Sequence, residues 1–205
     1  MHDNIVHLGP MITQYFHLFN RGVEKRSIFS SDKDRYRFLQ TIRFARLSKS
    51  PKLSLYLNQL KSNNEDRDRD VEKIFGPPYI TIIAYCLMPN HYHLQVKEEM
   101  KGGVIKFTKR LGDSYTKYFN TKHDRTGRLF ESACKTVRIE SDEQLIHLSR
   151  YIHTNPAKSE KTRFKPKELR EYPFSSLRIY LGQKKEPFCN PDEVISNFKS
   201  SDSYW

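Results

Sequence analysis

Long apolar runs are absent from this sequence. No stretch of its 205 residues approaches the roughly 20 consecutive apolar residues that a membrane-spanning helix requires. The N-terminal residues lack the basic-then-apolar layout of a secretory signal, and polar residues interrupt every short apolar run. We therefore expect a cytoplasmic protein that does not contact a membrane.

Cysteine is also scarce. The three cysteines, Cys86, Cys134 and Cys189, are odd in number and include no closely spaced pair. This pattern indicates neither a disulfide framework nor a zinc site built on cysteine. We expect small buried thiols in a reducing compartment.

Acidic residues are outnumbered by basic ones. The 36 Lys and Arg residues against 24 Asp and Glu give a formal net charge of +12 and a pI near 9.6. For a cytoplasmic chain this balance most simply indicates a polyanionic partner. Residues 106–123, KFTKRLGDSYTKYFNTKH, interleave basic side chains with rings, which suits an unpaired nucleic-acid strand. The same segment fits an amphipathic helix with a solvated basic face, and only the charge of the whole chain favours the first interpretation.

The order of apolar patterns along the chain predicts an α+β domain. Strands are expected at 12–22, 79–88, 91–98 and about 130–139. Helices are expected at 30–47, 104–123 and 141–158. Pro156 is expected to end the last helix, because the residue before a proline is pushed out of the α region. This order fits a ferredoxin-like antiparallel sheet with helices packed on it.

The domain organisation follows from shifts in composition. Residues 1–181 are expected to form one domain, interrupted at about 48–78 by a polar insertion with a short helix around 53–60. The insertion carries a run of alternating charges at 65–70. Residues 182–205 are expected to form a C-terminal tail.

The segment LMPNHYHLQVKE, residues 87–98, contains two histidines that need an explanation. On a strand, residues i and i+2 point to the same face, so His91 and His93 present two imidazoles side by side and Tyr92 faces away. Imidazole binds transition divalents and, less readily, manganese or magnesium when oxygens complete the shell. Alone, such a pair is more often structural than a metal site. The metal interpretation therefore needs a third ligand.

Tyr151 and Asn155 supply a possible complement to the histidines. Their spacing places a phenol and a carboxamide on one face of a helix. An amide oxygen is a suitable third ligand for a hard divalent ion. An asparagine before a proline is also a common helix terminator, and Tyr151 could be a core ring with an exposed hydroxyl. This segment alone leaves both interpretations open.

The sequence resembles the single-tyrosine HUH transposases, including the REP-associated tyrosine transposases, in five segments: HLFNRG (17–22), MPNHYHL (88–94), GRLFES (127–132), RYIHTNPAK (150–158) and YPFSSL (172–177). HUH denotes histidine, a bulky hydrophobic residue and histidine. The resemblance runs from about residue 13 to about residue 181. It departs from the family pattern at Tyr92, which is aromatic rather than aliphatic, and in the length of the insertion.

The resemblance implies a ferredoxin-like enzyme that binds single-stranded or hairpin DNA, usually as a homodimer, and cuts and rejoins strands. Tyr151 would take the 5′ phosphate covalently and leave a free 3′-OH. His91, His93 and Asn155 would hold a magnesium or manganese ion that polarises the phosphate. The residues expected to contact DNA are Arg21, Lys106, Lys109, Arg110, Lys117 and Arg128.

Two other functions compete with this one. A regulator with the same fold would bind DNA hairpins but no longer transpose. A metal-dependent hydrolase would use water and leave no protein adduct. Tyr115 and Tyr118 are interpreted as packing or stacking residues, His153 lies on a different helix face from Tyr151, and His147 is the better candidate for a residue that supports the site.

Overall fold

The computed structural model describes residues 13–49, 52–60, 73–158 and 164–205. Within them, one sheet contains four strands: β1 (Gln14–Arg21), β2 (Ile80–Met88), β3 (His91–Glu98) and β4 (Lys135–Ile139). The strand order is β2-β3-β1-β4, and every neighbouring pair is antiparallel. This is the order of a ferredoxin-like sheet, with β3 and β1 in the centre. The predicted α+β class is confirmed.

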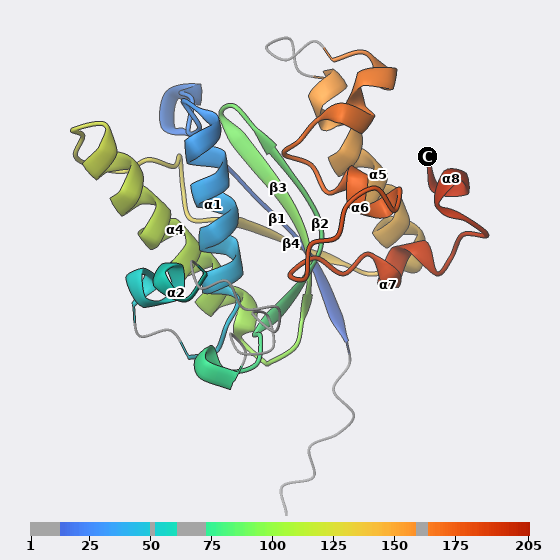
Figure 1. The fold of residues 1–205 in the computed structure, drawn as a ribbon, viewed down its shortest axis with the longest axis horizontal. Coiled ribbons are helices and arrows are strands. Elements are labelled where there is room, and N and C mark those ends of the chain that lie inside the picture. The colour runs from blue at the N-terminus through green and yellow to red at the C-terminus, as the bar shows by residue number, and fades with distance from the viewer. Residues whose placement is uncertain (1–12, 50–51, 61–72, 159–163) are drawn as a thin grey trace, which may run out of the picture.

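Helices cover both faces of the sheet. Their bounds are η1 (Val23–Lys25), α1 (Asp32–Ala45), α2 (Leu53–Leu60), α4 (Gly103–Lys122), α5 (Asp142–Lys158), η2 (Pro166–Glu171), α6 (Leu177–Tyr180), α7 (Asp192–Ile195) and α8 (Ser201–Tyr204). Figure 1 shows α1 and α4 on one face and α5 with α6 on the other. None of the described helices is long and apolar enough to cross a membrane.

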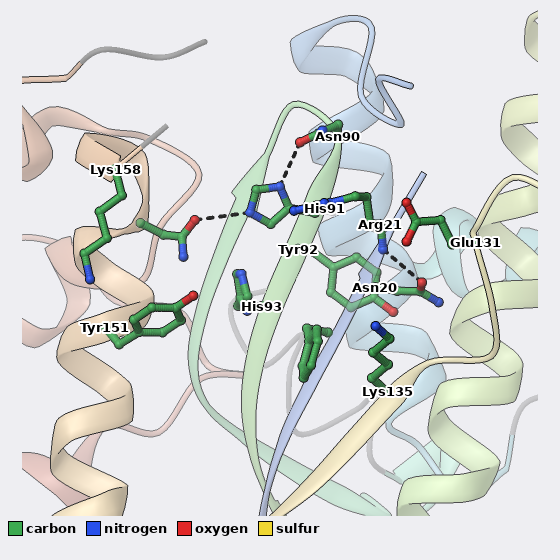
Figure 2. Close-up of a pocket in the computed structure, with 12 residues that line it drawn as sticks. Asn20, Arg21, Asn90, His91, Tyr92, His93, Glu131, Lys135, Tyr151 and Lys158 are labelled. Atoms are coloured by element: carbon green, nitrogen blue, oxygen red, sulfur yellow. Dashed lines mark hydrogen bonds between the residues drawn. The ribbon is translucent and has the colours of Figure 1, made fainter. Parts of the chain in front are cut away.

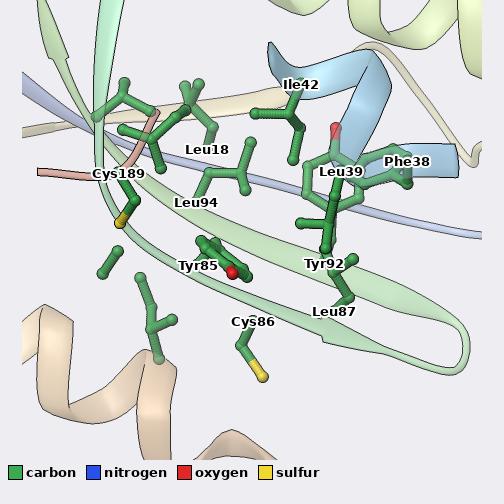
Figure 3. Packing of buried hydrophobic residues seen from close by; sticks show 14 of the residues in the cluster. Leu18, Phe38, Leu39, Ile42, Tyr85, Cys86, Leu87, Tyr92, Leu94 and Cys189 are labelled. Carbon is green, nitrogen blue, oxygen red and sulfur yellow. The ribbon is translucent and has the colours of Figure 1, made fainter. Parts of the chain in front are cut away.

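The two helical layers explain the composition of β2. Its nine residues are almost all buried, because both of its faces are covered and neither contacts water. Figure 3 shows Leu18, Tyr92 and Leu94 on the side of the sheet where Phe38 and Ile42 of α1 pack. Each such side chain contributes about 1.5–3 kcal/mol by leaving water. This packing fixes β3, and with it the two histidines, relative to α1.

The carboxylate of Asp34 ties the start of α1 to α4. It accepts hydrogen bonds from the Ser30 and Ser31 amides, from the Tyr118 hydroxyl at 3.0 Å and from the Lys122 ammonium at 2.5 Å. Burial alone would raise the pKa of Asp34, but the hydrogen bonds from Lys122, Tyr118 and Ser31 lower it below its usual value. Asp34 is therefore a buried carboxylate anion that these hydrogen-bond donors stabilise.

The insertion and the tail both contribute packed residues. α2 occupies the positions predicted for a short helix, and it joins a small buried cluster of Phe44, Leu47, Tyr56 and Phe75. The charge run at 65–70 lies outside the described residues. In the expected tail, Phe188, Cys189, Val194 and Tyr204 belong to the main core. The described part of the tail thus packs on the domain.

Two element boundaries differ from the sequence prediction. β4 begins at Lys135 rather than near residue 130, because Phe130 forms an isolated bridge with Gly22 and the chain bends before it joins β1. The expectation that α5 ends before Pro156 is wrong, because α5 continues to Lys158. Pro156 lies in the last turn, where a missing N–H removes only one hydrogen bond of the helix. The three cysteines are free thiols, with Cys86 and Cys189 buried.

Candidate active site

A cavity of about 540 Å³ lies between the ends of β1 and β3 and the helix α5 (Figure 2). The four predicted metal and catalytic residues, His91, His93, Tyr151 and Asn155, all line it. Its cationic residues are Arg21, Lys135 and Lys158. Residues 60 positions apart in the sequence are thus brought into one site.

Strand β3 presents its two histidines to the cavity as the alternation of a strand requires. The ring centroids of His91 and His93 lie 5.1 Å apart, and the two rings are nearly perpendicular. Tyr92 is only 2% exposed, and its ring packs 4.9 Å from Phe38 of α1. The predicted division of faces is confirmed, and Tyr92 is the bulky core residue between two site residues.

Helix α5 supplies Tyr151, Asn155 and Lys158 on one face, because spacings of four and three residues repeat with the helical turn. The Tyr151 side chain is 38% exposed, and its ring lies edge-on at 5.6 Å from His93. The Lys158 ammonium lies 4.7 Å from the centroid of the Tyr151 ring. Lys158 keeps this position because α5 continues through Pro156.

Both ring nitrogens of His91 face amide oxygens. Nδ1 is 2.8 Å from Oδ1 of Asn90, and Nε2 is 3.1 Å from Oδ1 of Asn155. Burial lowers the pKa of His91 and the charge of Arg21 lowers it further, whereas the hydrogen bond to the Asn155 oxygen raises it. A neutral imidazole carries one N–H, so it can satisfy only one of the two oxygens.

This geometry fits a cation between His91 and Asn155. When the Nδ1 proton goes to Asn90, the lone pairs of Nε2 and of the Asn155 oxygen face each other. Adjacent ligands on an octahedral magnesium ion, each about 2.1 Å from the metal, are about 3 Å apart. The 3.1 Å separation of these two atoms matches that value. The pair is therefore suited to share a hard divalent ion.

The candidate ligand set consists of two histidines and an amide, with no acidic side chain and no third histidine. Among the described residues there is no group of three His, Cys, Asp or Glu side chains that could hold a metal ion. Two imidazoles and one amide oxygen would supply three ligands, so an octahedral ion held by them would have further positions for water and phosphate oxygens. Magnesium is commonly held in this way, by few protein ligands together with the substrate.

The remaining histidine beside the site is His17 on β1, to which the sequence assigned no role. Its Nε2 lies 2.9 Å from Nδ1 of His93. Burial lowers the pKa of His17 to about 4. Burial, together with the charges of His17, His91 and Arg21, lowers the pKa of His93 to about 2. Both imidazoles are consequently neutral near pH 7, which is the form that binds metals.

The six residues predicted to contact DNA divide into three groups. Arg21 lines the cavity. Lys109, Lys117 and Arg128 line a second groove of about 880 Å³ between α4 and residues 128–134.

Of the described residues, Lys106 and Arg110 are not among those that line the cavity or the groove. The Lys106 ammonium lies 4.9 Å from the ring centroid of Tyr79. The Arg110 guanidinium donates to the carbonyl oxygens of Ala45 and Leu47. Lys135 and Lys158 line the cavity but were not predicted from the sequence. The helical spacing from Tyr151 to Lys158 could have indicated that Lys158 lies on the same face of the helix.

The other tyrosines and histidines have structural surroundings. The buried Tyr115 hydroxyl donates to the carbonyl of Ile28 at 2.6 Å, and Tyr118 donates to Asp34. His153 is buried and faces Tyr204 and Ser176. His147 is exposed and does not line the cavity.

Comparison with known proteins identifies the central part of the chain. Residues 64–155 match the family described as "Transposase IS200 like". Over these residues the chain is similar to the IS200-like transposases. The matching segment contains both histidines of β3 and ends at Asn155, so it includes Tyr151. The resemblance inferred from the sequence is confirmed.

Two further comparisons add less to the transposase assignment. No curated protein sequence matches the chain. A solved structure described as "Structure of the REP associates tyrosine transposase bound to a REP hairpin" is similar with 13% identity and a TM-score of 0.45, covering 87% of this chain and 90% of that chain. A likeness at this level carries no argument about the function of this chain.

Proposed function

We propose that this protein is a single-stranded DNA transposase or endonuclease that cuts and rejoins strands through a 5′-phosphotyrosine intermediate. A transposase is supported by the family match of residues 64–155. The observation that carries the finer proposal is the common cavity of Tyr151, Asn155, His91 and His93. A hydrolase or a simple binding protein would not require an exposed phenol beside such a ligand set.

The reaction exchanges one phosphodiester bond for another. The Tyr151 oxygen forms a bond to phosphorus while the bond from phosphorus to the 3′ oxygen breaks. The phenolic proton is lost to solvent, and the departing 3′ oxygen takes up a proton from solvent. The number of phosphoester bonds is conserved, so rejoining by the reverse attack needs no nucleotide cofactor.

Residues of this chain hold and orient the reacting groups. His91, His93 and Asn155 would bind a magnesium or manganese ion, which supplies Lewis-acid polarisation of the scissile phosphate when bound. Arg21 and Lys135 line the same cavity and can pair with phosphate oxygens. Lys158, above the ring of Tyr151, can pair with negative charge brought to that end of the cavity.

The second groove provides a path for the rest of the strand. Asn20, Tyr92 and Glu131 line both the groove and the cavity, so the two hollows are neighbours. Its cations are Lys109, Lys117 and Arg128, and its apolar residues include Ile105, which is 73% exposed. Cations beside exposed apolar surface suit phosphates and bases of an unpaired strand.

Gly112 is an additional reason to place a ligand in this groove. It lies inside α4, where a glycine costs roughly 1 kcal/mol relative to alanine. A Cβ atom at this position would meet nothing within 4 Å, so packing within the described residues does not require glycine. Gly112 lines the groove and places no side chain in it. We infer that the DNA strand lies against α4 at this position.

The proposed partner is single-stranded or hairpin DNA. The four central site residues of one chain line one cavity. The homodimer implied by the family resemblance stays a prediction.

The test is incubation of the protein with labelled hairpin DNA carrying a single-stranded flank, in magnesium or manganese, followed by a denaturing gel. We expect a labelled band that migrates with the protein. Binding without cleavage would contradict the proposal and indicate a regulator. Cleavage without a protein adduct would contradict it and indicate a hydrolase.

A further inference from the structure

His17 and His93 form a histidine pair at the edge of the cavity. The two rings lie edge to edge, with centroids 5.1 Å apart and an angle of 21° between their planes. His17 Nε2 and His93 Nδ1 are 2.9 Å apart, a hydrogen-bonding distance. His17 does not line the cavity, whereas His93 does. His17 therefore contacts the ligand residue from behind.

The hydrogen bond between the pair has two possible directions, and only one is compatible with metal binding. In the first, His93 donates its Nδ1 proton to His17, which leaves a lone pair on His93 Nε2. In the second, His17 donates from Nε2, and neutral His93 must carry its proton on Nε2. A protonated Nε2 cannot bind a cation. The hydrogen bond of the rear nitrogen thus decides whether His93 can act as a ligand.

Two aromatic neighbours enclose the ring of His93. His93 is 7% exposed, and Phe19 stacks on it with ring centroids 5.8 Å apart. Phe19 also packs on His17, with ring centroids 4.6 Å apart. His91 has an equivalent arrangement, because its Nδ1 faces Oδ1 of Asn90. Both histidines of β3 thus have a fixed partner at Nδ1.

We propose that His17 is a positioning residue that accepts the Nδ1 proton of His93 and so directs the Nε2 lone pair into the cavity. This inference rests on the proposed metal site and adds a residue to it. Partners of this kind typically change metal affinity by about 10-fold to 100-fold when they are removed. A residue that only packs against His93 would be replaceable by an apolar side chain of similar size.

The first test measures manganese binding to the full chain without DNA, by the loss of the free-ion signal in electron paramagnetic resonance. We expect His17→Leu to weaken binding by about 10-fold to 100-fold. His17→Gln keeps an acceptor oxygen and should restore most of the affinity. His147→Leu makes the same change at an exposed histidine outside the cavity and should have no effect. Equal affinity in His17→Leu and the unaltered protein would overturn the role of His17 alone.

The absence of manganese binding in the unaltered protein would overturn both this inference and the metal in the proposed function.

The second test needs no variant. Long-range proton–nitrogen NMR correlations of the histidine rings report which nitrogen carries the proton. We expect His93 to be protonated at Nδ1 and His17 to be unprotonated at Nε2. The opposite assignment, with the proton on His17 Nε2, would overturn the proposal even where His17→Leu fails to fold.

Discussion

The imidazole Nε2 of His91 lies 3.1 Å from the amide oxygen of Asn155. This contact joins strand β3 to α5, the helix that carries Tyr151. When His91 donates its Nδ1 proton to Asn90, both atoms of the close pair carry lone pairs that face each other. Two such atoms are stable at this separation when a cation lies between them. The candidate metal site therefore combines residues of two elements, β3 and α5.

Removal of either histidine of β3 should stop cleavage while leaving DNA binding largely intact. We expect His91→Ala and His93→Ala to reduce the cleavage rate by at least about 100-fold, because metal polarisation is worth several kcal/mol. DNA affinity should change little, since it comes mostly from phosphate contacts. Gel-based cleavage and fluorescence anisotropy measure the two quantities. His147→Ala is the matched control, and unchanged cleavage in both site variants would exclude this metal site.

Two substitutions at Gly112 should separate stability from DNA binding. Gly112→Ala should stabilise the fold by up to about 1 kcal/mol, because alanine is the better helix former. Gly112→Leu should also fold, since no atom lies within 4 Å of the added Cβ. The leucine side chain would enter the groove, so the affinity for single-stranded DNA should fall. Thermal unfolding and anisotropy provide the measurements, and unchanged affinity in Gly112→Leu would argue against DNA in this groove.

The buried carboxylate of Asp34 should make stability depend on pH in the acid range. Its pKa in the folded state is lowered, so the unfolded chain binds the proton more tightly. The stabilisation is therefore present above the ordinary carboxyl pKa of about 3.9 and is lost as the pH falls through the lowered folded value. Asp34→Asn should cost about 1–3 kcal/mol at pH 7 by leaving donors unpaired. Urea unfolding should show that the loss of unfolding free energy in Asp34→Asn is smaller at pH 3 than at pH 7. An equal loss at both pH values would contradict the role of the Asp34 carboxylate.

Local periodicity was sufficient to predict much of this architecture. The strand alternation of residues 91–98 placed both histidines on one face and Tyr92 in the core, as observed. The helical spacing of Tyr151 and Asn155 placed them together. These relationships lie within single elements, where backbone geometry determines which side chains share a face.

Contacts between different strands and helices could not be predicted from the sequence. His17 faces His93 because β1 pairs with β3 in a register that local pattern does not specify. The course of α5 through Pro156 was missed because tertiary packing holds a turn that local preference disfavours. The separation of Lys106 and Arg110 from the groove depends on which face of α4 meets the neighbouring segments.

The role of Tyr151 is the central claim, and one variant tests it most directly. Tyr151→Phe removes a single oxygen from a side chain that is 38% exposed, so folding and DNA affinity should be nearly unchanged. Tyr115→Phe, Tyr118→Phe and Tyr92→Phe serve as controls and should keep the adduct wherever they fold.

The decisive measurement is mass spectrometry of the nuclease-trimmed protein–DNA adduct formed by these proteins in manganese. The account predicts a 5′-phosphonucleotide on the peptide that contains RYIHTNPAK, residues 150–158, and no adduct in Tyr151→Phe. An adduct that persists in Tyr151→Phe, or one that maps to another tyrosine, would contradict it.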